Sequence, residues 1–161
     1  MRILKQMFAI VVFAVAMATS SLSLAYDVNS TSAVNVDDNG LALRGYDPVS
    51  YFQGDKPRQG SARFTASYNG MTFRFASEQN RNTFRSDPAK YAPQFGGFCE
   101  TGVMLSKKLD ADPNVYRIHD GKLYVYINAQ ARGVFLEDPV ENGRKAVRNW
   151  PLIKDKKPSE L

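Results

Sequence analysis

Hydrophobic and polar residues alternate along two parts of the chain, and a tight-turn signal divides each part in half. The halves are residues 63–68 and 71–76 in the first part, and residues 115–119 and 122–127 in the second. Asn69-Gly70 and Asp120-Gly121 separate them, and such pairs suit a type I′ turn because both central residues take a positive φ. Met71, Phe73 and Phe75 share one face of their strand. The pattern therefore predicts two β-hairpins.

Helix-start signals follow both hairpins. Ser77 is expected to cap a helix of about ten residues, because a serine side chain accepts a hydrogen bond from a free amide of the first turn. Phe84 lies on the face of this helix that is expected to anchor it in the core. Further starts are predicted at Asp47-Pro48, Asp87-Pro88 and Asn128, and a last helix is predicted from Pro139 to Asn149.

These elements define an α+β fold, in which a small antiparallel sheet built from two hairpins packs against several short helices. The predicted organisation is residues 1–25 as a signal peptide, 26–40 as a flexible lead-in, 41–151 as the folded domain and 152–161 as a disordered tail. No internal repeat is apparent beyond the Asp-Pro helix starts at residues 47 and 87. The 161 residues, 43% of them hydrophobic, are enough to build one domain with a core.

The N-terminal region has the organisation of an export signal. Arg2 and Lys5 form a basic start, residues 7–17 are an uninterrupted apolar run, and small residues precede the expected cleavage site after Ala25. A membrane anchor is the alternative, but a spanning helix needs about 20 apolar residues, more than this run provides. The chain is therefore expected to be exported, periplasmic or secreted, with no stable membrane anchor after cleavage.

The chain carries a net charge of +5, which falls to +3 without the two basic residues of the signal, because 19 basic side chains then face 16 acidic ones. These charges are scattered along the sequence. A nucleic-acid-binding protein is expected to cluster basic and aromatic side chains on one face. We therefore expect a solvated basic surface and no nucleic-acid partner.

Cys99 is the only cysteine, and it follows Gly96-Gly97 at the end of a loop. It has no internal disulfide partner in an oxidising compartment, and its distance from the signal excludes an N-terminal lipid anchor. A buried thiol, an intermolecular partner, a redox-active thiol and a metal ligand remain open. Cys99, His119 and Met104 are the candidate ligands for a soft metal such as copper or zinc. Met71 offers a further thioether, although a core methionine is equally expected.

No catalytic residue is expected in this chain. It has no Gly-x-Ser-x-Gly nucleophile motif and no glycine-rich phosphate loop, and His119 is the only histidine that would serve as a base. The carboxylates of the Asp-Pro pairs are expected to cap helices rather than to transfer protons. The sequence therefore predicts a protein that is not an enzyme.

Four segments together resemble one known family. They are GYDPVSYF from Gly45, YNGMTFRFASEQNRNTF from Tyr68, SDPAKYAPQFGGFC from Ser86 and DGKLYVYIN from Asp120. These segments resemble the YHS domain family, and in particular its exported, single-domain branch. The resemblance extends over roughly Leu41 to Trp150 and is strongest from Asp87 to Cys99.

The resemblance implies a metal-binding scaffold, since the short YHS domains attached to heavy-metal ATPases are thought to bind metal through thiols. Those thiols belong to a DPVC segment and an FCSxxC segment, and the corresponding positions here hold Ser50, Ala76 and Asn80. A hydroxyl, a methyl group and an amide do not replace thiolates as ligands of a soft metal. The chain therefore carries over the scaffold of the family without its metal ligands.

The sequence thus predicts an exported YHS-like binding domain that handles a metal or a small ligand near the Cys99 loop, residues 96–99. The alternative is a structural or protein-interaction module of the cell envelope with no chemical site. The expected partner is a small ligand or another, unknown envelope protein.

Overall fold

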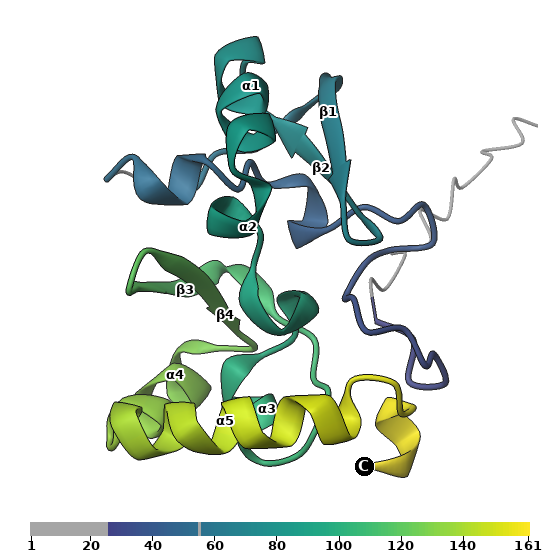
Figure 1. The fold of residues 1–161 in the computed structure, drawn as a ribbon, viewed down its shortest axis with the longest axis vertical. Helices are drawn as coiled ribbons and strands as arrows, with labels where there is room; N and C mark the ends of the chain where they lie inside the picture. The colour runs from purple at the N-terminus through teal and green to yellow at the C-terminus, as the bar shows by residue number, and fades with distance from the viewer. Residues whose placement is uncertain (1–25, 55) are drawn as a thin grey trace, which may run out of the picture.

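The computed structural model describes residues 26–54 and 56–161, and the predicted signal peptide, residues 1–25, lies outside the described part. Two units of similar architecture are stacked along the long axis of the molecule (Figure 1). Each unit contains one antiparallel hairpin, and the two hairpins form separate two-stranded sheets. The α+β class is confirmed, although the hairpins do not join into the single sheet that the sequence suggested.

The first unit is a hairpin followed by two helices. Its elements are β1 (Ser61–Tyr68), β2 (Met71–Phe75), α1 (Glu78–Ser86) and α2 (Pro88–Tyr91). The side chains of Ser77 and Asp87 each accept a hydrogen bond from the amide three residues further on, which confirms both predicted helix caps. Phe84 is buried as predicted, and its ring centroid lies 5.0 Å from that of Phe73 and 5.1 Å from that of Phe75.

The second unit adds a short helix before its hairpin and ends in the longest helix of the described residues. Its elements are α3 (Glu100–Met104), β3 (Asp112–His119), β4 (Lys122–Tyr126), α4 (Ala129–Leu136) and α5 (Pro139–Ile153). Asn128 caps α4 as predicted, and Asp138 caps α5. Helix α5 continues past the predicted end at Asn149 to Ile153. No helix among the described residues is long and apolar enough to cross a membrane.

The two units repeat the same elements at a spacing of 51 residues. The strands of both hairpins have equal lengths, and the strand register shifts at equivalent places, between Ser61 and Thr65 and between Asp112 and Tyr116. Each hairpin is followed by a capped helix and then by an Asp-Pro helix start. Six of the 31 aligned pairs in residues 61–91 and 112–142 are identical: Gly70/Gly121, Gln79/Gln130, Arg81/Arg132, Phe84/Phe135, Asp87/Asp138 and Pro88/Pro139.

The equivalence continues before the hairpins at a spacing of 52 residues. Leu43–Gly45 has φ values of 52°, 49° and 82°, and Phe95–Gly97 has φ values of 51°, 61° and 83°. Two residues after each turn, an amide donates to a carbonyl of the loop that leads into the hairpin, at 2.8 Å from Asp47 and at 3.0 Å from Cys99. Cys99 therefore occupies in the second unit the place that Asp47 occupies in the first.

The prediction that the chain has no internal repeat is therefore wrong. The repeat lies in the backbone: the turn, the strand lengths, the caps and the Asp-Pro starts recur, while most side chains between them differ. Caps and turns depend on a few residues, and core positions accept many apolar side chains of suitable volume. Two similar folds can thus arise from segments with little identity.

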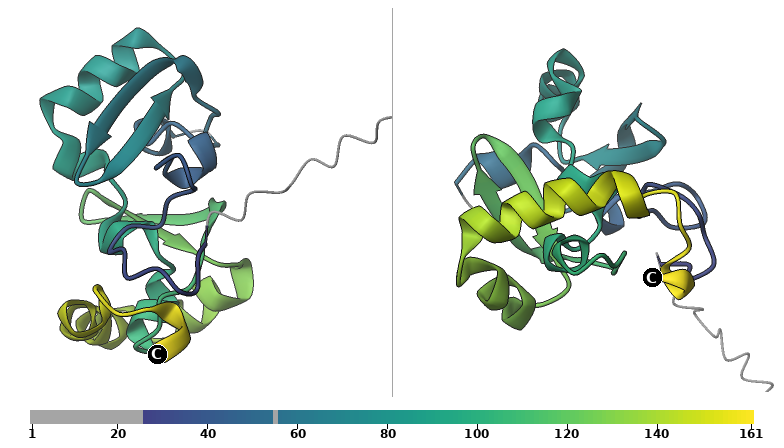
Figure 2. Two further views of the ribbon diagram at one scale, coloured as in Figure 1. Left: turned by 90° about the vertical axis from the view of Figure 1, so that its right-hand side faces the viewer. Right: turned by 60° about the horizontal axis from the view of Figure 1, so that its bottom comes forward.

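The lead-in, which the sequence suggested is flexible, packs against the turn between the two units (Figure 2). The amide of Asn35 donates to the carbonyl of Gly96 at 2.8 Å. A Cβ atom on Gly96 would lie 2.0 Å from the carbonyl oxygen of Ala33, so only glycine permits this approach. The double glycine is therefore a docking point for the lead-in.

The C-terminal residues 152–161, expected to be disordered, also pack against the domain. Leu161 contacts the core of the second unit. Lys108 is only 1% exposed, and its Nζ atom lies at the centre of this region. The Nζ atom donates to the backbone oxygens of Ser32 (2.7 Å), Lys154 (3.0 Å) and Lys156 (2.8 Å). One buried cation thus joins the lead-in, the loop before β3 and the tail.

Candidate functional site

Cys99 is fully buried in the apolar core of the second unit. Met104 belongs to the same cluster, whereas His119 lies exposed at the end of β3, with its Nε2 atom 3.4 Å from a carboxylate oxygen of Asp120. Within residues 26–54 and 56–161, no three His, Cys, Asp or Glu side chains are grouped so as to hold a metal ion. The metal site at Cys99, His119 and Met104 stays a prediction, and this geometry gives it no support.

Ser50, Ala76 and Asn80, the three positions where the resemblance implies thiols, surround Asp47, which is fully buried. The amide of Ala76 and the Nδ2 atom of Asn80 donate to its Oδ2 atom at 2.9 Å and 2.6 Å. The hydroxyl of Ser50 donates to its backbone oxygen at 2.7 Å. A carboxylate with these partners fixes the end of β2 to α1, so hydrogen bonds hold together the place where the resemblance implies a metal.

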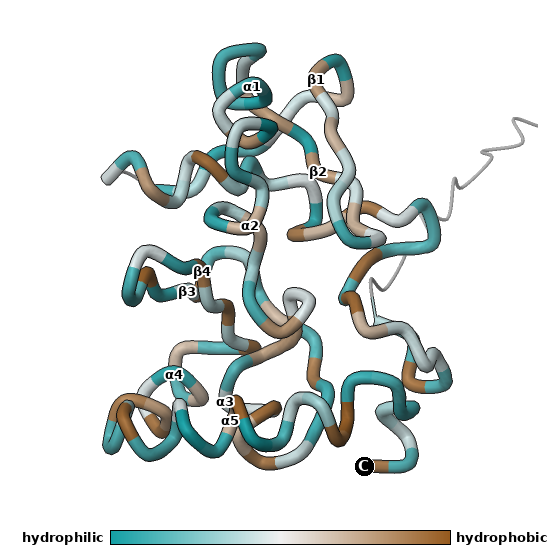
Figure 3. The backbone as a smooth tube through the Cα atoms, in the orientation of Figure 1, coloured by the Kyte–Doolittle hydropathy of each residue, from teal (hydrophilic) through white to brown (hydrophobic). Residues whose placement is uncertain are grey.

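A cleft of about 490 Å³ opens between the β3–β4 hairpin and α5, and its volume is in the range of small-molecule sites. We call it the α5 cleft. Its apolar walls are formed by Phe95, Tyr124, Val140 and Val147, and the backbone of Gly143 forms part of its edge. Hydrophobic positions recur among hydrophilic ones along α5 (Figure 3). Because Phe95 and Glu100 flank the Cys99 loop, the cleft lies next to the loop that the sequence singled out.

A polar cluster of Glu100, Arg117 and Tyr126 adjoins the α5 cleft, and Glu100 and Arg117 belong to the lining of the cleft. Glu100 is 2% exposed, and its two carboxylate oxygens accept hydrogen bonds from Nη2 of Arg117 at 3.1 Å and 3.2 Å. The hydroxyl of Tyr126 also donates to Glu100 through a short hydrogen bond. The guanidinium carbon of Arg117 lies 5.1 Å from the ring centroid of Tyr124 and 5.0 Å from that of Phe135, at cation–π distance.

Burial sets the protonation behaviour of this cluster. It raises the pKa of Glu100 above its usual value, against the opposing effects of the hydrogen bond from Tyr126 and of the charge of Arg117. Burial also raises the pKa of Tyr126, and the neighbouring Glu100 raises it further, so this hydroxyl keeps its proton. Perturbed carboxyl groups with a charged partner in a cleft are typical of functional sites.

In the first unit a similar backbone forms without such a cluster. The positions equivalent to Glu100, Arg117 and Tyr126 in the first unit are occupied by Pro48, Ala66 and Phe75, all apolar. Conversely, the buried pair Asp47 and Asn80 of the first unit is replaced by Cys99 and Ala131 in the second. The same backbone is thus stable around apolar residues, and the polar cluster needs another explanation.

Arg117 retains hydrogen-bonding capacity on the side of the cleft. Both of its hydrogen bonds to Glu100 come from Nη2, and Nε is buried without a partner among the described residues. Its side chain is 16% exposed and contributes to the lining of the cleft. A guanidinium group presents five donors in a plane, so one carboxylate does not saturate it.

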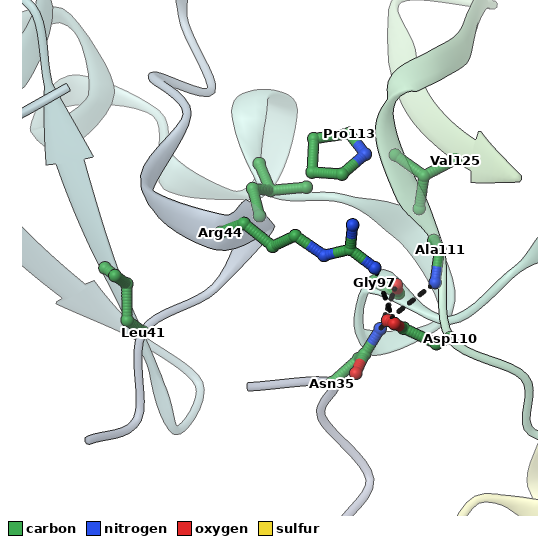
Figure 4. Close-up of a pocket in the computed structure, with 9 residues that line it drawn as sticks. Asn35, Leu41, Arg44, Gly97, Asp110, Ala111, Pro113 and Val125 are labelled. Carbon is green, nitrogen blue, oxygen red and sulfur yellow. Dashed lines mark hydrogen bonds and ion pairs between the residues drawn. The ribbon is translucent and has the colours of Figure 1, made fainter. Parts of the chain in front are cut away.

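A second, smaller cavity lies at the junction of the two units (Figure 4). Asp110 accepts hydrogen bonds there from Nη2 of Arg44 at 2.6 Å, from Nδ2 of Asn35 at 2.9 Å and from the amide of Ala111 at 2.7 Å. The cavity of about 10 Å³ has room for a single water, which would satisfy the buried Oδ1 atom of Asn35. We interpret it as a structural joint, because no larger ligand fits.

The family model of the YHS domain matches residues 50–95, which belong to the first unit and the turn that follows it. The resemblance to the YHS domain is thereby confirmed for this segment, while its assignment to an exported, single-domain branch stays a prediction. No curated protein and no solved structure matches the chain. The match ends at Phe95, so the α5 cleft lies almost entirely in the unit outside it.

Glu100, Arg117 and Tyr126 are not conspicuous in the sequence and are absent from the predicted site residues. Arg117 and Tyr126 lie in strands whose alternation of hydrophobic and polar residues is typical of any β-hairpin. Glu100 is typical of an acidic residue in the first turn of a helix. The available signal was the alignment of the two units, in which a glutamate, an arginine and a tyrosine stand opposite apolar residues. This comparison becomes possible only once the two units are recognised as a repeat.

Proposed function

We propose that this chain is an exported, non-enzymatic binding domain that holds a small molecule in the α5 cleft. The first unit, which matches the YHS domain, supplies the scaffold, and the second unit supplies the site. The observation that carries the proposal is the buried cluster of Glu100, Arg117 and Tyr126, placed where the first unit has only apolar side chains. Burying an ion pair generally adds little stability compared with apolar residues, so retention of the cluster favours a role in binding.

The surface chemistry of the cleft supports the same proposal. Val140 and Val147 are 62% and 66% exposed on α5, yet they line the cleft together with Phe95 and Tyr124. Concave sites with apolar walls and a few polar groups are typical of small-molecule binding. Glu100, by contrast, is held by two partners and is nearly inaccessible, so the cluster is suited to orienting Arg117 rather than to catalysis.

The test uses three probes that share a naphthalene ring and differ in charge: 2-naphthylmethanol, 2-naphthoate and 2-naphthylmethylamine. We expect at least one of them to shift the NMR signals of Tyr124, Val140 and Val147 saturably, with a Kd below about 1 mM. Absence of saturable binding for all three probes would refute the proposed function.

A blocking variant and its matched control locate the binding. Gly143→Leu places a side chain at the edge of the cleft, where a Cβ atom meets no other heavy atom within 4 Å. Gly133→Leu makes the same change on α4, also in open space, but outside the cleft lining. Both changes remove a helical glycine and raise helix propensity. We expect Gly143→Leu alone to abolish probe binding, and equal binding by both variants would place the probe elsewhere.

A further inference from the structure

We propose that the ligand of the α5 cleft is a small amphipathic carboxylate, whose carboxylate group binds Arg117 and whose apolar body lies against Tyr124, Val140 and Val147. This inference rests on the proposed function, since it specifies the ligand of the same cleft. Three features support it: the free donors of Arg117, the arginines of the cleft lining and the arrangement of its apolar walls.

Arg117 is positioned as an anchor for an oxyanion. Its guanidinium group is held between the rings of Tyr124 and Phe135, and Glu100 takes hydrogen bonds from only one of its nitrogen atoms. The side chain of Arg117 is 16% exposed and lines the cleft, so part of its guanidinium group is accessible there, whereas Nε is buried without a partner among the described residues. A carboxylate is planar and accepts hydrogen bonds from two donors of one guanidinium group, so it matches this anchor in shape and charge.

Three arginines around the cleft can meet an anion. The lining contains Arg117, Arg144 and Arg148 against the carboxylates of Glu100 and Asp120, and Glu141 beside the lining makes the formal charges equal, three against three. Arg144 and Arg148 both lie near one carboxylate, that of Glu141, at 3.8 Å and 3.1 Å. One acid shared by two arginines leaves part of their charge available to a ligand at the rim.

The apolar walls require a hydrophobic body on that anion. Val140 and Val147 are two helical turns apart on one face of α5, and Phe95 and Tyr124 come from the turn and the hairpin that border the cleft. A simple inorganic anion would leave these side chains in water. An aromatic or alkyl body would cover them, and each CH₂ group removed from water stabilises the complex by about 0.8 kcal/mol.

The experiment compares the affinities of the three naphthyl probes for the wild-type protein, together with decanoate as a carboxylate with an alkyl body. We expect 2-naphthoate to bind about tenfold or more tightly than 2-naphthylmethanol, as a charge-assisted hydrogen bond adds to the shared ring contacts. Comparison of 2-naphthoate with decanoate then decides between an aromatic and an alkyl body. Equal affinities for 2-naphthoate and 2-naphthylmethanol, or tightest binding of the amine, would overturn the carboxylate while leaving the proposed function standing.

Two variants assign the preference to Arg117. Glu100→Gln removes the competing carboxylate and keeps Arg117, so the preference for 2-naphthoate should persist or increase. Glu100→Gln/Arg117→Met removes both buried charges together, and we expect the preference to disappear while 2-naphthylmethanol still binds. Should the double variant fail to fold, the wild type provides the test: 2-naphthoate must shift the NMR signals of the guanidinium N–H groups of Arg117. An unchanged signal, or a preference that survives in the folded double variant, would contradict the assignment.

Discussion

The buried cluster of Glu100, Arg117 and Tyr126 should be dispensable for folding, provided that it is replaced as a whole. Arg117→Met alone leaves the carboxylate of Glu100 buried without its charged partner, which typically costs 3–5 kcal/mol, so we expect a loss of about 4 kcal/mol in the free energy of unfolding. Glu100→Leu/Arg117→Met/Tyr126→Phe makes the second unit resemble the first at these positions. Replacing a buried ion pair by apolar residues of similar volume is often neutral or stabilising.

The expected result is therefore a large non-additivity. The free energy of unfolding of the triple variant should be within about 1 kcal/mol of the wild-type value or higher than it, although the variant contains the destabilising Arg117 substitution. Urea denaturation followed by the fluorescence of Trp150 measures the effect, because this tryptophan, the only one in the chain, contacts Phe95 and Phe98 of the second unit. A triple variant as unstable as Arg117→Met would refute the reasoning and would make the cluster a requirement of the fold.

Four further predictions concern the rest of the molecule. Lys108→Met should lower the free energy of unfolding by at least about 2 kcal/mol and speed proteolysis of both chain ends, because three backbone carbonyls lose their donor. Gly96→Ala should lower the free energy of unfolding by at least about 2 kcal/mol, and Gly121→Ala by only about 1 kcal/mol. Both glycines have a positive φ, but a Cβ atom would strike a neighbour only at Gly96. Equal losses in urea denaturation would refute the close approach. Because burial raises the pKa of Glu100, the folded state binds the proton of this group more tightly than the unfolded state does. The contribution of Glu100 to stability should therefore fall as pH rises above its usual pKa of 4.5. Glu100→Gln should remove this fall of Tm with pH from thermal unfolding curves. Copper(I) or zinc should raise the Tm of the wild type no more than that of Cys99→Ala, because the thiol is buried among apolar side chains; a larger shift in the wild type would revive the metal site.

The local elements could be predicted from the sequence because each depends on a few neighbouring residues. The Asn69-Gly70 turn, the caps at Ser77, Asp87 and Asn128 and the burial of Phe84 are all found in the structure. Each of these features rests on an amide partner, a backbone angle or an apolar face within one short segment. Short-range physical chemistry was therefore sufficient for them.

The packing of the lead-in and the tail could not be predicted, since it depends on groups far apart in the sequence. Lys108 reads as an ordinary surface lysine until three distant carbonyls are brought around it. The double glycine at Gly96 indicates an unusual backbone conformation, but the residue that approaches it is Ala33, more than sixty residues away in the sequence. Long-range contacts of this kind leave no periodic signal in the chain.

The proposed site lies next to the segment that the sequence singled out, because Phe95 and Glu100 on either side of the Cys99 loop line the α5 cleft. The chemistry, however, was expected from the thiol, and the structure buries that thiol and presents Arg117 to the cleft in its place. A lone cysteine is conspicuous in a sequence. An arginine in a hairpin becomes informative only when the two units are aligned and Arg117 is compared with the equivalent residue of the first unit, Ala66.

The most direct test of the account is an NMR titration of the wild-type protein with 2-naphthoate and 2-naphthylmethanol. Both probes should shift the signals of Tyr124, Val140 and Val147. We expect 2-naphthoate to bind about tenfold more tightly, and it alone should strongly shift the guanidinium N–H signals of Arg117. Shifts confined to other surfaces, or no saturable shift with these two probes or with 2-naphthylmethylamine, would contradict the claim that the α5 cleft is a binding site.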